Sequence, residues 1–365
     1  NKMKIGIIAR TWFTSSKGGS ERYIARVFEE LKKNHEVKVI TLDTSKDKDV
    51  IQIKLPKIPL ITQVLFSFLA STSMNRFKPD VCLVNQYWGE FSALLLKVRW
   101  VPIIHDIGLF YSKWAKRSYL KHFLRTRVLK QMAKRTELII VPSKLTADDL
   151  RTYLKVPKER IKMVPEGVDL DKFTPTRIKH NGINLVCVGR IAPNKGLDIL
   201  LSAFRAIKKK YPDSRLYLVG GVLKGQRDYY NKLKRLVETL NLDDVVFTGY
   251  VSDEDLARYY NLTDIYVQPS VGEEGWGMSI AEAFACKKPV ICSDIFQKTG
   301  VADRNRALIV RGADSEELAK AIETLIENGG LRKKLAENGY IFAQRLSWKQ
   351  MAGEILKVVN NLVDN

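Results

Sequence analysis

Two glutamates, Glu274 and Glu282, stand with seven residues between them in the segment Ser270–Asp294. A carboxylate accepts hydrogen bonds from two or more hydroxyl groups, so this pair could hold a ligand rich in hydroxyls. A helix is predicted to begin between the two glutamates, and the free N–H groups of a helix start attract anions. Taken alone, two glutamates favour a plainer interpretation, a loop charge and a surface cap. The turn and helix start between them comprise Gly275, Trp276, Gly277, Met278 and Ser279, with the helix expected from about Trp276.

A second segment, residues 186–204, reads VCVGRIAPNKGLDILLSAF and places Arg190 and Lys195 five residues apart. Both follow a strand-like run, so both can face the carboxyl end of that strand, and Lys195 is expected to open a helix. Two fixed cations at this point can neutralise a diphosphate. Standing alone, the two residues are equally well explained as solvated surface charges.

Two further segments have residue types that suit a binding site. Gly18 and Gly19 precede a helical pattern, so their N–H groups could hold a phosphate; a plain helix-initiating turn is the alternative. His105, in PIIHDIG, ends a predicted strand, where α/β proteins gather their sites. A satisfied structural histidine is the alternative there. The sequence contains no dinucleotide-binding G-x-G-x-x-G and no P-loop.

The chain supplies a scaffold for these residues as short β-branched runs that alternate with helical patterns. Such alternation is typical of an α/β fold with parallel sheets covered on both faces. The pattern restarts near residue 183, and 365 residues exceed one compact core, so we expect two domains. The predicted strands are Lys4–Ala9, Glu36–Leu42, Val81–Val84, Pro102–Ile104, Leu138–Val141, Lys162–Val164, Ile183–Val188, Arg215–Val219, Val245–Thr248, Asp264–Val267, Pro289–Cys292 and Ala307–Val310.

Taken together, these segments resemble the retaining glycosyltransferases, especially glycosyltransferase family 4. Glu274 and Glu282 match the family's E-x7-E motif, and residues 188–196 match its V-G-R-x-x-x-x-K-G stretch. Residues 18–22 match G-G-x-E-R, and residues 105–106 match an H-D element. Because further landmarks at 141–150, 164–173 and 247–270 follow in the family's order, the resemblance spans essentially the whole chain.

The resemblance implies the GT-B fold, in which two Rossmann-like domains face each other across a cleft. Residues 1–172 and 346–365 would form the N-terminal, acceptor-side domain. Residues 173–345 would form the C-terminal domain that binds the nucleotide-sugar. Domain closure would hinge near residues 172–182 and 345–348.

The resemblance also implies the reaction. An acceptor hydroxyl would attack the anomeric carbon of a nucleotide-diphospho-sugar, such as a UDP- or GDP-sugar, with retention of configuration. Glu274 would orient the sugar, Glu282 would hold the ribose, and His105 would contact the donor sugar. No cofactor and no metal are expected beside this co-substrate, and the three Asp-x-Asp triplets are interpreted as turn and cap residues. The diphosphate would meet Arg190, Lys195, the Gly18–Gly19 loop and the helix start near Gly277, and the base would meet the backbone of Tyr250 and Val251.

The chain departs from the family pattern at three places. Glu166 stands where the family usually has Asn in P-N-G-V-D, and residues 286–289, Cys-Lys-Lys-Pro, replace a small-Gly-x-Pro run. The glycine pair and Glu expected soon after the next strand are absent. That last region helps to shape the donor side, so the identity of the donor sugar stays open.

Positive charge is concentrated in the first half of the chain. The net charge is +21, and residues 1–172 carry 33 Lys and Arg against 17 Asp and Glu, a net of +16. Residues 107–135 hold no acid. One interpretation is a basic amphipathic helix that faces anionic lipid or a lipid-pyrophosphate acceptor. The other is a solvated helix that covers the sheet. Ile58–Phe68 and Tyr87–Trp88 could add an apolar acceptor surface, although we expect core packing for most of them. The cations of the basic segment are Lys113, Lys116, Arg117, Lys121, Arg125, Arg127, Lys130, Lys134 and Arg135.

The remaining composition indicates a cytosolic protein. The four cysteines lack C-x-x-C spacing, so we expect buried reduced thiols rather than zinc or disulfides. No signal peptide or bilayer-spanning run is recognised, which predicts a cytoplasmic protein, with attachment to the cytoplasmic membrane face through the basic domain as an added expectation. The expected partners are the nucleotide-sugar and a glycan or lipid-linked acceptor. Another GT-B enzyme, such as a sugar-nucleotide epimerase or a phosphorylase, is the main alternative, and a nucleic-acid binder is a weaker one because no such motif is present.

Overall fold

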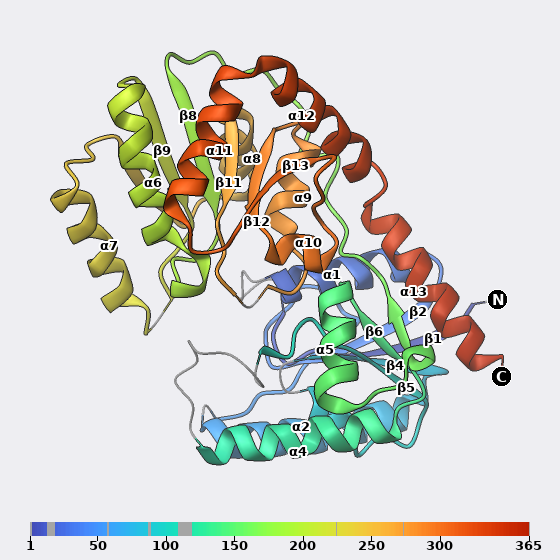
Figure 1. The fold of residues 1–365 in the computed structure, drawn as a ribbon. Coiled ribbons are helices and arrows are strands. Elements are labelled where there is room, and N and C mark those ends of the chain that lie inside the picture. Colours follow the sequence, from blue (N-terminus) through green and yellow to red (C-terminus); the bar gives the residue numbers. More distant parts are fainter. Residues whose placement is uncertain are drawn as a thin grey trace. The chain divides into compact units, whose positions relative to one another are not determined.

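The structure is a computed structural model that describes residues 2–12, 19–56, 58–86, 89–108, 119–223, 225–272 and 274–364. The chain divides into two compact units, which are described separately (Figure 1). Unit 1 comprises Asn1–Gly167 and Trp348–Asn365, and unit 2 comprises Val168–Ser347. The divisions predicted from the sequence lie at 172/173 and 345/346. The assignment of the acceptor to one domain and the donor to the other stays a prediction.

Within the described residues, unit 1 holds a seven-stranded parallel sheet in the order β3-β2-β1-β4-β5-β6-β7. The first strand lies inside the sheet and the chain adds strands outward on both sides, which is the Rossmann arrangement. All five residues of β4 are buried, because helices cover both faces. The strands are β1 (Lys4–Ile8), β2 (Glu36–Thr41), β3 (Val50–Gln52), β4 (Val81–Asn85), β5 (Trp100–Ile103), β6 (Ile139–Val141) and β7 (Ile161–Met163).

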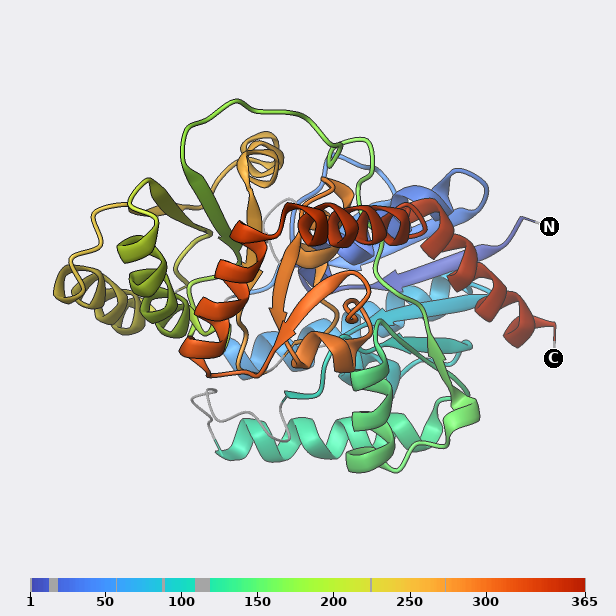
Figure 2. The ribbon, with the colours of Figure 1, turned by 45° about the horizontal axis from the view of Figure 1, so that its top comes forward.

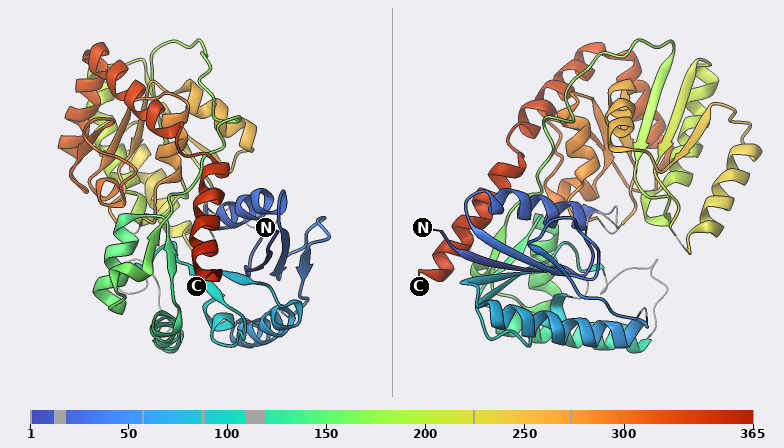
Figure 3. Two further views of the ribbon diagram at one scale, coloured as in Figure 1. Left: turned by 90° about the vertical axis from the view of Figure 1, so that its right-hand side faces the viewer. Right: turned by 180° about the vertical axis from the view of Figure 1, so that it is seen from behind.

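Helices cover this sheet on its two faces. The first and last helices of the unit, α1 and α13, pack together, while α2 and α4 lie on the opposite face (Figure 3). α5 packs against α4 (Figure 2) and begins at the N-cap Ser143, whose side chain accepts a hydrogen bond from the Thr146 N–H. The helices are α1 (Gly19–Lys32), α2 (Pro59–Phe77), α3 (Gly89–Ala93), α4 (Tyr119–Arg135), α5 (Lys144–Leu154) and α13 (Trp348–Val363).

Unit 2 repeats the arrangement with six described parallel strands in the order β10-β9-β8-β11-β12-β13. Two hydrophobic clusters fill the space between this sheet and its helices. The strands are β8 (Ile183–Val188), β9 (Ser214–Val219), β10 (Val245–Gly249), β11 (Ile265–Gln268), β12 (Val290–Ser293) and β13 (Ala307–Val310). The helices are α6 (Leu197–Lys210), α7 (Arg227–Thr239), α8 (Asp253–Leu262), α9 (Met278–Ala285), α10 (Ile295–Thr299), α11 (Ser315–Glu327) and α12 (Gly329–Ala343).

The chain leaves unit 1 and returns to it at neighbouring points. In unit 2, the Val168 N–H donates to the Leu346 carbonyl, close to the two ends of the unit. In unit 1, Gly167 packs so closely on Trp348 that a Cβ at residue 167 would come 2.6 Å from the indole ring. Unit 2 is therefore one continuous segment inserted into unit 1.

The structure confirms the predicted α/β class and places a strand at each of the twelve predicted runs, with shifted ends at most of them. It adds β3, which the sequence did not indicate. The four cysteines are buried and unpaired, as expected. Core packing of most of Ile58–Phe68 was a wrong prediction, because Ile58, Ile61, Val64, Leu65 and Phe68 are exposed. Tyr87 and Trp88 lie outside the described residues.

Candidate functional site

The candidate site in unit 2 lies where the order of its sheet reverses. β8 is the first strand of the unit, and its neighbours β9 and β11 continue the chain in opposite directions across the sheet. At such a reversal the connections leave adjacent strands on opposite faces, which opens a crevice for a ligand at the carboxyl ends. The loops after β8 and β11 are the two segments with the predicted chemistry, residues 189–196 and 269–277.

The loop after β8 brings Lys195 to the loop after β11. The expectation that Lys195 opens a helix is wrong, because it ends a 3-10 turn and α6 begins at Leu197. Gly196 between them has a φ of 65°, and a Cβ there would come 2.2 Å from the Pro269 carbonyl oxygen. Glycine at this position therefore permits both the left-handed backbone and the close approach of the two loops.

Glu274, in the loop after β11, is buried and pairs with Lys195. The Lys195 Nζ lies 2.7 Å from the Glu274 Oε1, and the Ser270 Oγ donates to the same oxygen at 2.6 Å. The Lys195 and Glu274 side chains are only 14% and 9% exposed. Because an unpaired buried charge costs several kcal/mol, each side chain holds the other in place. A ligand at this point meets a fixed cation and a fixed carboxylate.

Polar contacts extend from Glu274 back to the strand. The Gln268 Nε2 donates to the Ser270 Oγ at 3.2 Å, and the Tyr266 hydroxyl donates to the Gln268 Oε1 at 2.7 Å. The Ser279 Oγ on α9 lies 3.4 Å from the same amide oxygen. Burial raises the pKa of Tyr266 well above its ordinary value, so this hydroxyl stays a donor. The acid is therefore held by a continuous polar chain.

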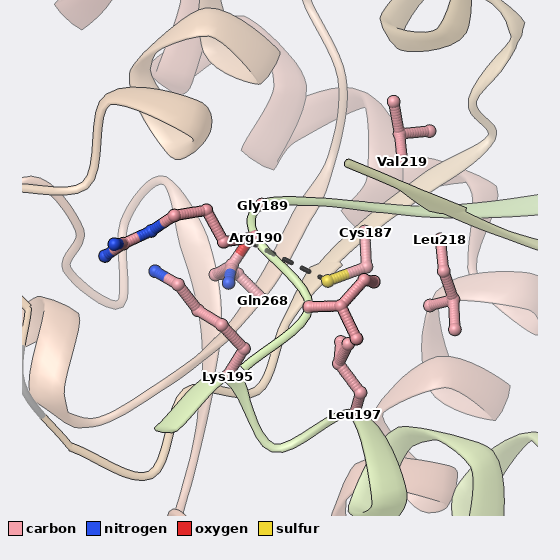
Figure 4. Close-up of a pocket in the computed structure, with 9 residues that line it drawn as sticks. Cys187, Gly189, Arg190, Lys195, Leu197, Leu218, Val219 and Gln268 are labelled. Carbon is pink, nitrogen blue, oxygen red and sulfur yellow. Dashed lines mark hydrogen bonds between the residues drawn. The ribbon is translucent and has the colours of Figure 1, made fainter. Parts of the chain in front are cut away.

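Arg190 and Lys195 line a pocket at the end of β8, and their side chains extend to the same side of it (Figure 4). Arg190 is exposed and forms no hydrogen bond or ion pair with the residues that the structure describes. Burial raises the pKa of the neighbouring Cys187 thiol to about 12, so this side chain is neutral. The pocket thus offers an anion one unshared cation, Arg190, beside the Lys195 ammonium that Glu274 shares.

The helix that follows Glu274 starts later than expected. α9 begins at Met278, not near Trp276, and Gly277 caps it with a φ of 115°. A Cβ on Gly277 would lie 3.0 Å from the side chains of Phe296 and Val301. The turn therefore needs glycine for its backbone and for its contact with α10 and the segment after it.

Glu282 lies on α9 and faces the interior of unit 2. The side chain is 4% exposed, and its Oε2 accepts a hydrogen bond of 2.7 Å from the Tyr260 hydroxyl. Burial, and then the Glu282 charge, raise the pKa of Tyr260 well above its ordinary value. Tyr260 is therefore a permanent donor to this carboxylate, which the sequence did not indicate.

The remaining predicted donor residues of unit 2 differ in their surroundings. Trp276 is buried in a hydrophobic cluster, whereas Gly275 and Met278 are half-buried. Tyr250 is 52% exposed and follows β10 together with the half-buried Val251. Because β9 separates β10 from β8, these two residues lie two strands away from the strand that precedes Arg190.

In unit 1, His105 follows β5 and is held on several sides. Its Nε2 lies 2.8 Å from the Asn85 Oδ1 and its Nδ1 lies 3.4 Å from the Glu166 Oε1. The Tyr23 ring packs against it edge-on at 5.0 Å, and the Gln86 Oε1 accepts from its backbone N–H at 2.6 Å. The imidazole is buried, so it is a fixed group at the carboxyl ends of β4 and β5.

The predicted glycine loop is described only in part. Gly18 lies outside the described residues, and Gly19 is the exposed first residue of α1. The Glu21 carboxylate in the first turn accepts from Thr11 Oγ1 and from Ser20 Oγ, each at 2.9 Å. An acid near a helix start is stabilised by the helix dipole.

Comparison with known proteins agrees with this geometry. The family model "Glycosyl transferases group 1" matches residues 170–361, more than half of the chain, and the model "Glycosyltransferase Family 4" matches residues 17–172. The chain belongs to the group 1 glycosyl transferases. Mannosylfructose-phosphate synthase of Agrobacterium fabrum is 26% identical over 308 residues, which are 75% of this chain and 67% of the relative.

Solved structures share the fold of this glycosyltransferase over its whole length. Sucrose-phosphate synthase from Thermosynechococcus elongatus has a TM-score of 0.85 at 24% identity and covers 99% of both chains. Anabaena Alr3699/HepE in complex with UDP-glucose has a TM-score of 0.80 at 20% identity, over 98% of this chain and 100% of that one. The GT-B fold predicted from the sequence is thereby confirmed.

The three sequence departures of this glycosyltransferase have visible structural surroundings. Glu166, in place of the usual Asn, is the carboxylate beside His105. Lys287, in place of the usual Gly, has a left-handed φ of 55° after α9. The divergent stretch after β12 forms α10, whose Phe296 packs against the Gly277 turn. This stretch therefore supports the loop that holds Glu274.

The sequence missed the polar residues that support the chemical ones in this glycosyltransferase: Asn85, Gln86, Tyr260, Tyr266, Gln268 and Ser270. Four of them stand at the carboxyl end of a strand or just after it, and that position is the signal that could have found them. Among the described residues, no group of three His, Cys, Asp or Glu could hold a metal ion. No helix in the described part of the chain is long and apolar enough to cross a membrane.

Proposed function

We propose that this glycosyltransferase transfers a sugar, with retention of configuration, from a UDP- or GDP-sugar to a hydroxyl of an acceptor such as a lipid-linked glycan or a polysaccharide. The observation that carries the proposal is the buried Lys195–Glu274 pair with Arg190 beside it, at the reversal point of the second sheet. This arrangement combines cations for a diphosphate with a carboxylate for sugar hydroxyls.

In the proposed reaction, the acceptor oxygen bonds to the anomeric carbon as the bond from that carbon to the β-phosphate oxygen breaks. The leaving nucleoside diphosphate takes the acceptor proton on the same face of the sugar, so no protein nucleophile is needed. Arg190, Lys195 and the start of α9 stabilise the charge that develops on the phosphate. Glu274 orients the sugar, Glu282 serves the ribose, and His105 contacts the sugar from the other domain.

The relatives support this class of reaction. Two of the similar proteins are named as synthases of sucrose phosphate and of mannosylfructose phosphate, and the Anabaena protein was solved with UDP-glucose. Because Arg190 and Lys195 supply positive charge themselves, we propose that no metal is required. Activity that survives EDTA would support this part, and activity that needs added Mg²⁺ would contradict it.

A thermal-shift screen of UDP-, GDP- and ADP-sugars tests donor binding. One nucleotide-sugar at about 100 times its Kd should stabilise the protein by about 2.7 kcal/mol. Arg190→Ala should remove most of this shift, because it deletes charge-assisted hydrogen bonds to the diphosphate. The matched control Arg205→Ala, at an exposed position of α6, should keep it. The proposal fails if no nucleotide-sugar raises the melting temperature of the wild type.

Product analysis tests the reaction itself. Nuclear magnetic resonance of the product should show the donor's anomeric configuration in the new glycosidic bond. Conversion of a nucleotide-sugar with no acceptor present would instead indicate an epimerase, and phosphorolysis of a glycan would indicate a phosphorylase. Tight, salt-sensitive RNA binding without nucleotide-sugar binding would favour the nucleic-acid alternative.

A further inference from the structure

Helix α2 of unit 1 exposes apolar side chains and buries polar ones. Its outward positions carry large apolar side chains, and several of its inward positions carry polar ones. Val64 and Phe68 are 56% and 59% exposed, the highest values among the large hydrophobic residues that the structure describes. A surface helix normally shows the reverse pattern. The exposed apolar residues, called the α2 stripe below, are Ile58, Ile61, Val64, Leu65, Phe68 and Leu69; the buried polar ones are Thr62, Gln63, Ser67 and Ser71.

Two of the inward polar side chains of α2, Thr62 and Ser71, bond to backbone, whereas the buried Ser67 Oγ has no partner among the described residues. The Thr62 Oγ1 contacts the Pro56 carbonyl and accepts from the Ile58 N–H, and the Ser71 Oγ donates to the Ser67 carbonyl at 2.7 Å. The orientation of the helix is set by Phe66, Ala70 and Met74, which are fully buried in the core of unit 1. The α2 stripe therefore faces away from this core and stays exposed.

The α2 stripe forms one continuous surface. Its members recur at spacings of three and four residues, which places them on one side of the helix over about 16 Å. Their exposed fractions correspond to an apolar area on the order of 500 Å², a size at which exposed patches are commonly binding surfaces. Beyond Leu69 the same side of the helix carries Thr72, Asn75 and Arg76, so the stripe ends in polar residues.

Helix α4, on the same face of the sheet, adds positive charge without any acid (Figure 3). Arg127, Lys130 and Lys134 are exposed on it, and Phe123 is exposed nearer its N-terminus. Both helices connect parallel strands, so their N-terminal halves lie by the carboxyl ends of the strands, the edge that carries His105. The α2 stripe and Phe123 thus lie toward this edge, while Arg127, Lys130 and Lys134 follow from the middle of α4 to its C-terminal end on the same face of the sheet.

The charge of this face indicates which partner fits it. A second copy of the chain would present the same cations and, since α2 and α4 hold no Asp or Glu, no complementary acids. An anionic bilayer offers both phosphates for the cations and acyl chains for the α2 stripe. We propose that α2 and α4 dock unit 1 on an anionic membrane, with Val64 and Phe68 inserted below the headgroups.

This docking deepens the proposed function, because a membrane would present a lipid-linked acceptor at the edge that carries His105. Binding to the membrane does not itself require catalysis. The two proposals can therefore fail separately.

Co-sedimentation of the full chain with vesicles tests the docking. Vesicles of phosphatidylglycerol and phosphatidylcholine at a ratio of about 1:2 should bind the wild type, and pure phosphatidylcholine should bind it at least roughly tenfold more weakly. Val64→Ser/Phe68→Ser should weaken binding to the anionic vesicles by roughly tenfold or more. Arg127→Glu/Lys130→Glu should weaken it similarly, because the charge is reversed.

The matched control is Val246→Ser/Ile341→Ser, which removes two comparably exposed apolar side chains from unit 2. It should bind like the wild type. The proposal is overturned if this control weakens vesicle binding equally, or if the wild type does not bind anionic vesicles. The wild type could instead sediment as a dimer and the Val64→Ser/Phe68→Ser variant as a monomer in sedimentation velocity. That result would contradict membrane docking and indicate self-association through the α2 stripe. The nucleotide-sugar thermal shift should be the same in all these variants, so its loss in the wild type would count against the proposed function alone.

Discussion

At the scale of single residues, Glu166 is the departure with the clearest chemical consequence. It replaces a neutral amide by a carboxylate that is 6% exposed and faces the His105 Nδ1 at 3.4 Å. The charge also reaches Tyr23, whose pKa is raised first by burial and then by Glu166. The opposite side of the imidazole is held by Asn85. We therefore expect Glu166 to act as a positioning residue for His105.

Glu166→Gln keeps the shape of the side chain and removes its charge. Because the imidazole loses a charged neighbour at a buried site, we expect kcat/KM for the acceptor reaction to fall by roughly tenfold, or about 1.4 kcal/mol of transition-state stabilisation. The nucleotide-sugar thermal shift should fall by less than it does in Arg190→Ala, because Glu166 acts on the donor only through His105. Initial rates at varied substrate concentration measure the effect.

A double-mutant cycle separates this role from general stability. If Glu166 acts through His105, then Glu166→Gln should have little further effect in a His105→Ala background. Additive losses in the double variant would contradict the positioning role.

The candidate site residues were easier to find in the sequence than the residues that contact them. Glu274, Glu282, Arg190 and Lys195 stand at spacings that match a family pattern. Single polar residues such as Gln268 have no spacing of their own, and nothing in the chain indicated that Glu274 would be buried against Lys195. Their importance arises from three-dimensional contacts between segments far apart in sequence, such as Lys195 and Glu274, which are 79 residues apart.

At the scale of helices and strands, periodicity predicted most elements but not which side of α2 faces out. A helix that carries apolar residues nearly all round gives no preferred face, so core packing was the natural prediction for Ile58–Phe68. β3 was missed because an edge strand of three residues is too short to show alternation. Two helices, α6 and α9, begin later than predicted, and each has a glycine at its N-cap, Gly196 and Gly277.

The end of α9 offers a test of backbone strain. The Lys287 N–H donates to the Phe284 carbonyl and the Lys288 N–H to the Ala283 carbonyl, the hydrogen-bond pair of a Schellman motif. This motif favours glycine at the left-handed position, where Lys287 has a φ of 55°. Lys287 also pairs with Glu337 at 2.5 Å, which a substitution would remove.

Lys287→Gly should therefore be measured in a Glu337→Gln background, where the ion pair is already absent. We expect the free energy of unfolding of unit 2 to rise by about 0.5–1 kcal/mol, because glycine relieves the left-handed strain. Urea denaturation followed by circular dichroism measures the change. A loss of stability in this background would show that the backbone at residue 287 is not strained.

At the scale of the whole molecule, the two units differ in how they depend on the chain order. Unit 2 is continuous and contains its own two hydrophobic clusters. Unit 1 needs α13, which buries six side chains and packs on α1. At about 1.5–3 kcal/mol for each large apolar side chain, these contacts are comparable to the whole stability of a domain.

Residues 168–347 expressed alone should therefore melt cooperatively, whereas residues 1–167 should not. Thermal melts followed by circular dichroism distinguish the two outcomes. The prediction would be contradicted by a cooperative melt of residues 1–167 or by aggregation of residues 168–347 at low concentration.

The two-domain organisation itself was predictable from length and from the restart of the strand pattern. The dependence of unit 1 on α13 was not, because it follows from the packing of Trp348 and its neighbours.

The return of the chain to unit 1 also determines the order in which the two units are completed during translation. Translation delivers all of unit 2 before α13 exists, so the inserted unit can finish folding while the first-made one still lacks a helix. During that interval the face of α1 that α13 later covers is open to chaperones and proteases. A ribosome that stalls before Trp348 would release a chain with its later half folded and its earlier half unfinished.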